Sequence, residues 1–192
     1  MYLLCGLGNP GKKYKFTRHN VGFRIIDKLI SFYEINNYKS DNKTLIHKGF
    51  INQEPCFFFK SLNYMNLTGP YLSSFINFYK ISLDKTIIIH DDLDIKFGKI
   101  KYKKGGSNGG HKGLESIDEV LGTEYFRLRI GIGHPGQKNL VDKYVVENFK
   151  DTDEVIFKKL ISLISKNFSF LINNNKDLFL NKIAEQMDQK KK

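Results

Sequence analysis

The sequence has few of the features that stabilise small secreted domains or span membranes. Only two of its 192 residues are cysteines, Cys5 and Cys56, and both lie in apolar, strand-like runs where a thiol usually acts as a small buried hydrophobe. No apolar run approaches the roughly 18 residues needed to cross a bilayer. The apolar N-terminal segment, residues 1–7, is short and lacks a basic leader, which indicates a buried strand rather than a secretion signal. We therefore expect a protein of the cytoplasm.

Metal-binding motifs are also absent from the sequence. A histidine and three acids lie together at residues 90–94, but there is neither an H-E-x-x-H pattern nor a calcium-binding loop. An acidic metal cage also fits poorly beside so many lysines. We expect no metal and no other cofactor.

The remaining pattern predicts a single α/β domain. With 192 residues, 41% of them hydrophobic, the chain can bury one full core. Apolar runs rich in β-branched and aromatic residues predict strands at 2–7, 44–50, 56–60, 86–90 and 126–132. Helical spacing predicts helices at 21–33, 72–79, 155–172 and 178–187, the first of them capped by Asn20. Alternating strands and helices indicate an α/β sheet within residues 1–188, followed by a disordered basic tail at 189–192.

The chain is strongly basic, with 31 lysines and arginines against 20 aspartates and glutamates, and a net charge of +11. Cations gathered on one face attract phosphates over several ångströms, so this charge favours a polyanionic partner. Lysine, asparagine and isoleucine are abundant along the whole chain, however, and a compositional bias of the genome would produce part of the charge as solvated surface. Charge alone leaves both interpretations open.

The first predicted strand leads into Gly6-Leu7-Gly8-Asn9-Pro10-Gly11, which has the G-x-G-x-x-G spacing of dinucleotide-binding proteins. That fingerprint needs a helix opening at the glycines, whereas here residues 12–15 intervene and helical periodicity begins only at Val21. The hypothesis of an NAD-dependent oxidoreductase therefore depends on the glycine spacing alone. We interpret the segment as a turn that brings Asn9 and residues 17–20 to the carboxyl edge of the sheet, where open α/β sheets bind ligands.

Polar residues at two strand ends provide a candidate base and a carboxylate. His19 lies in a loop just before a helix, where its imidazole can titrate near neutrality and accept a proton from water. Asp91 follows the buried strand that ends near residue 90, so it can hold the second nitrogen of the His19 ring. On local grounds such a histidine is more often structural, and Asp92 and Asp94 can simply cap turns.

Two further loops can contact a substrate. Asn66, in the loop at 63–69, can polarise a carbonyl or bind its oxyanion, although it or Thr68 can equally cap the next helix. The loop at 101–113 interleaves cations with five glycines, and such a backbone can approach phosphates closely. Because it lacks the spacing of a nucleotide P-loop, we interpret it as a contact to a nucleic-acid backbone or a mobile rim of the site.

Taken together, these segments resemble the bacterial-type peptidyl-tRNA hydrolases. The similarity is carried in order and spacing by residues 6–11 with Tyr14, 17–20, 64–69, 90–94, 105–111 and 126–135. It extends from about Leu3 to Phe149, whereas the C-terminal helices agree only in length and character. The resemblance implies a monomer with a mixed, mostly parallel twisted sheet surrounded by helices. It also implies an enzyme that cleaves the ester between a peptide and the terminal ribose of tRNA.

The resemblance assigns the catalytic roles residue by residue. It implies that His19 is the base that activates water and that Asp91 orients it, without a covalent intermediate. Asn9 and Asn66 are implied to hold the ester and the peptide. An RNA-binding protein that keeps the fold and basic face but has lost hydrolysis, as in some splicing-associated relatives, is the main alternative. The presence of all four residues argues against it.

The other implied contacts surround this centre. They are Tyr14 and Met65 as walls of the site, His111 and Lys112 as further substrate contacts, and Lys101, Lys103 and Arg129 as contacts to tRNA phosphates. The tRNA contacts implied for Lys101, Lys103 and Arg129 agree with the polyanionic partner that the net positive charge favours. Lys112 departs from the family, because many relatives carry there an asparagine thought to place water and the tRNA 3′ end. Lysine offers no acceptor for a proton of water, so the role of Lys112 is open.

Overall fold

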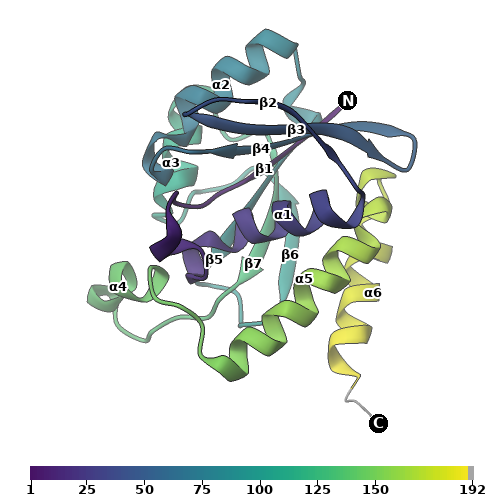
Figure 1. Cartoon of the computed structure of the whole chain (residues 1–192). Helices are drawn as coiled ribbons and strands as arrows, with labels where there is room; N and C mark the ends of the chain where they lie inside the picture. Colours follow the sequence, from purple (N-terminus) through teal and green to yellow (C-terminus); the bar gives the residue numbers. More distant parts are fainter. Residues whose placement is uncertain (190–192) are drawn as a thin grey trace.

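A seven-stranded mixed sheet forms the centre of the protein in the computed structural model, which describes residues 1–189 (Figure 1). The strand order is β2-β3-β4-β1-β5-β7-β6. Strands β4, β1, β5 and β7 are parallel, whereas the β2–β3, β3–β4 and β6–β7 pairs are antiparallel. The strands span Tyr2–Gly6 (β1), Asn36–Ser40 (β2), Thr44–Ile51 (β3), Glu54–Ser61 (β4), Thr86–Asp92 (β5), Ile100–Lys104 (β6) and Phe126–Gly131 (β7).

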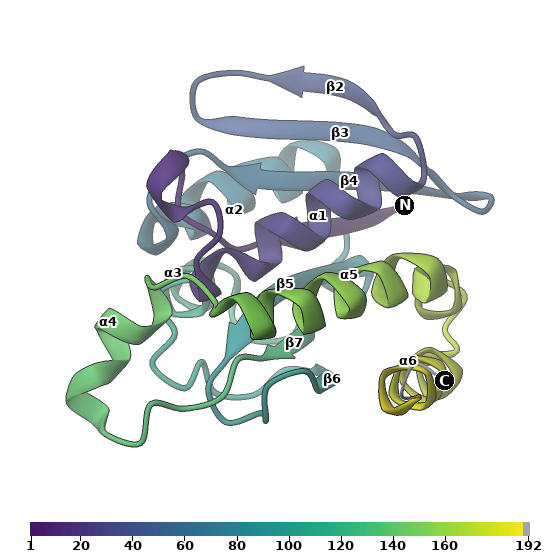
Figure 2. The same cartoon turned by 60° about the horizontal axis from the view of Figure 1, so that its bottom comes forward.

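Helices cover both faces of the sheet (Figure 2). On one face lie α1 (Val21–Phe32), α5 (Asp151–Ile172) and α6 (Lys176–Asp188), and on the other α2 (Thr68–Tyr79) and α3 (Lys112–Leu121). Because both faces are covered, the central strands are apolar on both sides: Leu4 and Phe58 point to the α1 layer, Leu3 and Phe57 to the α2 layer. None of the described helices is long and apolar enough to cross a membrane.

The predicted α/β domain with a mixed, mostly parallel sheet is confirmed, but two strands, β2 and β6, and two α-helices, α3 and the short α4 (Val141–Val145), are not predicted by the sequence pattern. Strand β2 is exposed along its whole length and lacks apolar alternation, so only its pairing with β3 defines it. The interpretation of residues 101–113 as one loop is wrong at both ends, because Lys101–Lys104 belong to β6 and Lys112 begins α3. Of the predicted disordered tail, only Gln189 falls within the described residues.

Asn20 does not cap α1, contrary to the prediction from its position. Its side chain instead accepts from the backbone N–H of Asn9 at 2.8 Å and donates to the carbonyl of Asn9 at 2.9 Å. These two hydrogen bonds fix the glycine-rich turn after β1 against the start of α1. Asn20 therefore stabilises the loop that carries Asn9 rather than the helix end.

Candidate active site

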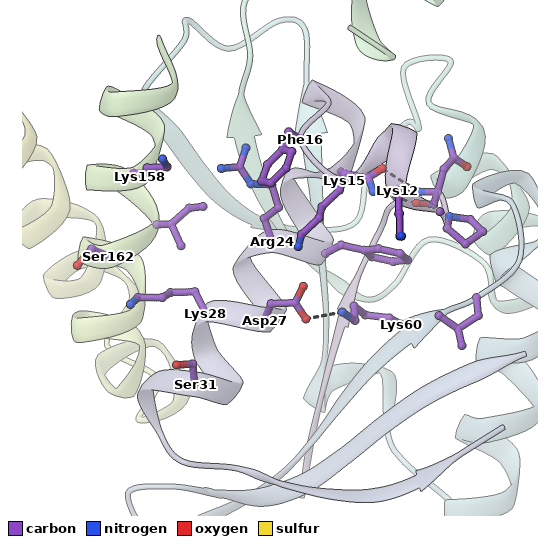
Figure 3. Close-up of a pocket in the computed structure, with 17 residues that line it drawn as sticks. Lys12, Lys15, Phe16, Arg24, Asp27, Lys28, Ser31, Lys60, Lys158 and Ser162 are labelled. Carbon is purple, nitrogen blue, oxygen red and sulfur yellow. Dashed lines mark hydrogen bonds and ion pairs between the residues drawn. The ribbon is translucent and has the colours of Figure 1, made fainter. Parts of the chain in front are cut away.

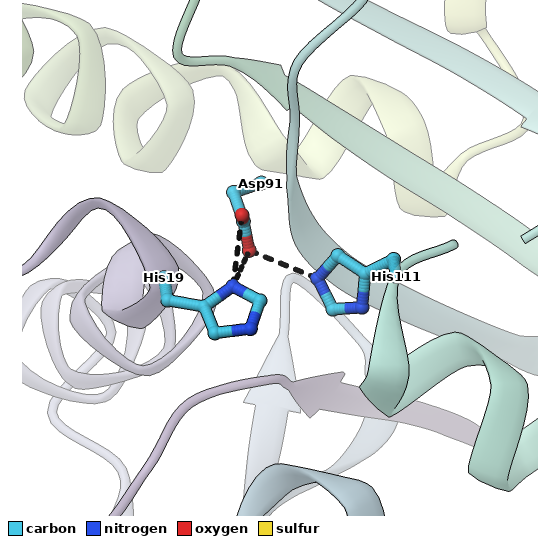
Figure 4. Close-up of side chains that lie close together, drawn as sticks. All are labelled: His19, Asp91 and His111. Atoms are coloured by element: carbon cyan, nitrogen blue, oxygen red, sulfur yellow. Dashed lines mark hydrogen bonds and ion pairs between the residues drawn. The ribbon is translucent and has the colours of Figure 1, made fainter. Parts of the chain in front are cut away.

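The polar centre of the protein lies at the carboxyl end of β5, where Asp91 meets His19 (Figure 4). The Asp91 side chain is 2% exposed, and each of its carboxylate oxygens lies 2.9 Å from Nδ1 of His19. A carboxylate can only accept, so Nδ1 carries the proton and donates it to Asp91. The other ring nitrogen, Nε2, is then the unprotonated one in neutral His19, and it points away from Asp91.

Contacts of neighbouring residues fix the backbone on both sides of His19. Gly22 lets the start of α1 lie directly against the end of β5, since a Cβ there would be 2.2 Å from the carbonyl oxygen of Ile89. On the other side, the buried Arg18 donates to the carbonyl of Tyr144 at 3.1 Å, and its guanidinium lies 4.0 Å from the centre of the Tyr144 ring. His19 is thus held between two fixed neighbours.

His111 holds the same carboxylate from the other side. Its Nε2 lies 2.9 Å from Oδ1 of Asp91, while its Nδ1 accepts from the backbone N–H groups of Gly113 and Leu114 at 3.2 and 3.3 Å. Because Nδ1 accepts, Nε2 must carry the proton in the neutral ring and donate it to Asp91. His111 therefore caps α3 and links that helix to the carboxylate. Both of its ring nitrogens are engaged within the protein.

The charges of this centre depend on one another. Burial alone would raise the pKa of Asp91, but the two imidazoles facing it outweigh burial and hold this pKa well below its usual range. Burial also lowers the pKa of His19, whereas the charge and hydrogen bond of Asp91 raise it by more, so the net shift is upward. His90, buried beside the His111 ring, stays neutral because burial lowers its pKa to about 3. Asp91 is therefore an ionised carboxylate among histidines.

One group of residues within 1–189 offers three metal-ligating atoms that lie within 4.8 Å of one another. It consists of His19, Asp91 and His111. A metal would need the lone pair of Nε2 of His111. The backbone N–H groups at the start of α3 already use the lone pair of Nδ1, and this places the proton on Nε2. The arrangement therefore fits a network of proton donors around Asp91 better than a metal site.

Asn9 connects the turn after β1 to the loop that precedes α2. Its side-chain oxygen accepts from the backbone N–H of Met65 at 2.9 Å, so its amide N–H groups are the part left for a ligand. Met65 is buried beneath this loop rather than forming an open wall, and it packs where a Cβ on Gly113 would meet it at 2.6 Å. The sequence predicts Met65 as a wall of the site, whereas the structure buries its side chain beside Gly113.

The two loops that Asn9 joins also carry Tyr14, Tyr64 and Asn66. The rings of Tyr14 and Tyr64 pack edge to face with their centres 6.5 Å apart, and Tyr64 is 56% exposed. Asn66 is exposed, and its side chain makes no hydrogen bond within residues 1–189. The alternative that Asn66 or Thr68 caps α2 is wrong, because neither side chain accepts a backbone N–H of that helix; the N–H of Gly69 donates to Oγ of Ser116 at 3.0 Å instead. The Asn66 amide is free to meet a ligand.

The cations expected to contact tRNA lie on strands β6 and β7. Lys101 and Lys103 are exposed on β6, and Lys101 pairs in register with Arg129 of β7. Nε of Arg129 donates to Asp92 at 2.7 Å, and its side chain is 19% exposed. Lys112 lies on the surface, where it donates to Glu115 at 2.9 Å. Lys101 and Lys103 are therefore open to a partner, whereas Arg129 and Lys112 already have one.

A mixed α/β sheet with a histidine–carboxylate pair at its carboxyl edge fits an enzyme that uses a histidine base, such as a hydrolase, and the comparisons with known proteins identify the family. Residues 3–192 match the family model described as Peptidyl-tRNA hydrolase. A Bartonella henselae protein named peptidyl-tRNA hydrolase is 40% identical over 190 residues, covering 99% of this chain and 98% of that protein. One from Ehrlichia ruminantium is 42% identical over 185 residues, covering 96% and 95%.

Solved structures agree with the sequence matches. The crystal structure of peptidyl-tRNA hydrolase from Acinetobacter baumannii has a TM-score of 0.89 and 34% identity, covering 95% of this chain and 94% of that one. The chain therefore belongs to the peptidyl-tRNA hydrolase family. The match also includes the C-terminal helices, which the sequence motifs alone leave outside the resemblance.

Proposed function

We propose that the protein hydrolyses the ester between the peptide and the tRNA in peptidyl-tRNA, with His19 as general base and Asp91 as the acid that orients it. The observation that carries this proposal is the orientation of the His19 ring. Nδ1 is bound to a buried carboxylate, and Nε2 is left as the acceptor. Family membership supports the substrate class, because the matched relatives are named peptidyl-tRNA hydrolases.

In the proposed reaction, Nε2 of His19 takes a proton from water as the water oxygen attacks the ester carbonyl. Asp91 stabilises the imidazolium that forms. The amides of Asn9 and Asn66 donate to the oxygen that becomes negative. When the tetrahedral intermediate collapses, the bond to the ribose oxygen breaks and that oxygen receives the proton from His19. The peptide carboxylate and free tRNA are released, and no covalent enzyme intermediate forms.

We assign His111 as a positioning residue for Asp91 instead of a substrate contact. A carboxylate that accepts from two rings can rotate less than one that accepts from His19 alone. The position of His111 is itself fixed, because it caps α3 with its other nitrogen. Through His111, the start of α3 keeps Asp91 in line with His19.

The exposed cations on β6 supply the proposed contact to tRNA. Lys101 and Lys103 are on one face of the strand, and that face also carries Arg129 of the neighbouring strand. Lysines so placed attract phosphates without fixing a rigid geometry. The proposal includes action as a monomer in the cytoplasm, without a metal or organic cofactor.

Release of free tRNA from N-acyl-aminoacyl-tRNA tests this function directly. We expect release by the purified protein at an unchanged rate in the presence of EDTA. Binding of the same substrate without release would instead favour the RNA-binding alternative. Loss of release with EDTA, restored by a divalent metal, would contradict the metal-free mechanism.

A further inference from the structure

A cavity of about 680 Å³ lies on the α1 side of the sheet, next to the His19–Asp91 centre but separate from it (Figure 3). Its walls are the loop at 9–16, the outer side of α1, the end of β4 and part of α5. Of the residues proposed for hydrolysis, only Asn9 borders it. The volume is within the range of roughly 300–1,000 Å³ that is typical of small-molecule sites.

The lining of this cavity is strongly positive. It contains one carboxylate, Asp27, and six cations, which are Lys12, Lys15, Arg24, Lys28, Lys60 and Lys158. Asp27 is paired with Lys60, and Arg24 is paired with Glu154. Within the part of the chain that the structure describes, Lys12, Lys15 and Lys28 form no ion pair. Their charge is therefore left for an anionic ligand.

Aromatic rings hold two of the other cations, Lys60 and Arg24, in place. Lys60 is 8% exposed, and its Nζ lies 5.3 Å from the centre of the Phe23 ring. The Arg24 guanidinium lies between Phe16 and Phe157, 5.6 and 4.5 Å from their ring centres. Phe16 itself is 50% exposed at the cavity rim. An open aromatic ring beside unpaired lysines is the combination that binds a base and its phosphate.

An acidic peptide fits this lining less well than a nucleotide. A peptide bound by strand addition needs an open strand edge, but β4, which lines the cavity with Lys60, is paired on both sides with β1 and β3. The remaining walls are helices and one loop. Side chains therefore supply the available contacts, and these are cationic and aromatic.

We propose that this cavity binds a nucleotide, with the base against Phe16 and the phosphate among Lys12, Lys15 and Lys28. The nucleotide is either free or an unpaired nucleotide of an RNA chain. The site is distinct from the tRNA contacts proposed on β6, because β6 forms one edge of the sheet and β4 lies on the other side of β1. Figure 3 shows Lys12 and Lys15 extending from the loop toward the paired Asp27 and Lys60.

The test is an NMR titration of the isotope-labelled full chain with AMP, UMP and a tetra-adenylate RNA, with inorganic phosphate and a tetra-aspartate peptide as controls. We expect chemical-shift changes at residues 11–16 and 24–31. Phe16→Ala and Lys28→Glu should each weaken nucleotide binding by about tenfold. Lys166→Glu, an exposed lysine of α5 outside the cavity, is the matched control and should leave binding unchanged. None of the three should alter hydrolysis more than about twofold.

The outcomes separate the possible ligands. Binding of AMP comparable to that of tetra-adenylate supports a site for free nucleotides, whereas binding of tetra-adenylate alone supports a site for an RNA chain. The proposal is overturned if no nucleotide shifts these residues, or if phosphate binds as tightly as AMP and Phe16→Ala has no effect. Tighter binding of the tetra-aspartate peptide than of any nucleotide would also overturn it.

Discussion

The His19–Asp91 centre and the basic edge of the sheet differ in how they hold charge. In the centre, Asp91 is almost fully buried, and two histidine rings donate to it. At the basic edge, which we define as Lys101, Lys103 and Arg129, the two lysines are exposed and only Arg129 is held, by Asp92. Buried, directed hydrogen bonds fix a geometry, whereas exposed cations supply mainly attraction. Substitutions should therefore change kcat in the centre and affinity at the edge.

The largest effect that would separate the two regions is expected from Asp91→Asn. An amide can present its N–H to His19, which would stabilise the wrong tautomer and remove the charge that supports the imidazolium. We expect kcat to fall about 10³- to 10⁴-fold with little change in the Kd for N-acyl-aminoacyl-tRNA. Asp94→Asn, an exposed acid of the same cluster, is the control and should retain activity. Equal activity of the two variants would contradict the role of Asp91.

A smaller loss is expected from His111→Ala, which tests whether His111 acts through Asp91. Removing one of the two rings that hold the carboxylate should lower kcat about 10- to 100-fold at nearly constant KM. His111→Asn offers both a donor and a helix cap, so it should recover part of the activity. A rise in KM with unchanged kcat would show that His111 contacts the substrate instead.

The pH dependence of kcat/KM reports the protonation state of His19. The base must be neutral, and Asp91 raises the pKa of His19 above its ordinary 6.5. Activity should therefore fall as the pH drops through this raised pKa, by about tenfold per pH unit below it. Lys103→Ala, at the basic edge, should leave the midpoint unchanged. A midpoint below 6.5 would mean that burial, not Asp91, dominates at His19.

The smallest effect is expected at the basic edge itself. Lys103→Ala should weaken tRNA binding several-fold and lower the slope of log Kd against log salt concentration by about one, since one phosphate contact is lost. kcat should change little. Lys176→Ala, an exposed lysine at the start of α6, provides the control for net charge alone. If both variants have the same slope, the charge acts through the whole surface and not through this edge.

The fold and the meeting of His19 with Asp91 could be predicted because they depend on local patterns. Apolar runs define the central strands, and polar residues directly after parallel strands reach one edge of the sheet. His111 could not be placed on Asp91 in this way, because its position depends on where the glycine-rich loop ends and α3 begins. The pairing of Arg129 with Asp92 likewise depends on the register of β5 and β7, which no local pattern gives.

Residues with two possible partners were the hardest to predict from the sequence. Asn20 has the residue type and position of a helix cap, yet its amide binds both backbone groups of Asn9. Met65 has the apolar character of a site wall, yet it is buried as a support. In both cases the tertiary structure selects a partner that is distant in sequence. Local propensity therefore identifies the loops of the site better than the contacts within them.

The central claim is that His19 performs the chemistry while the basic edge performs the binding. It is tested most directly by measuring, on the same N-acyl-aminoacyl-tRNA, the single-turnover release of tRNA and the Kd for wild type and His19→Ala. We predict that His19→Ala binds with a Kd within about threefold of wild type, because its phosphate contacts are intact. The rate of tRNA release should fall by at least the 10²- to 10⁴-fold expected for removal of a general base. Release at the wild-type rate by His19→Ala would contradict the account.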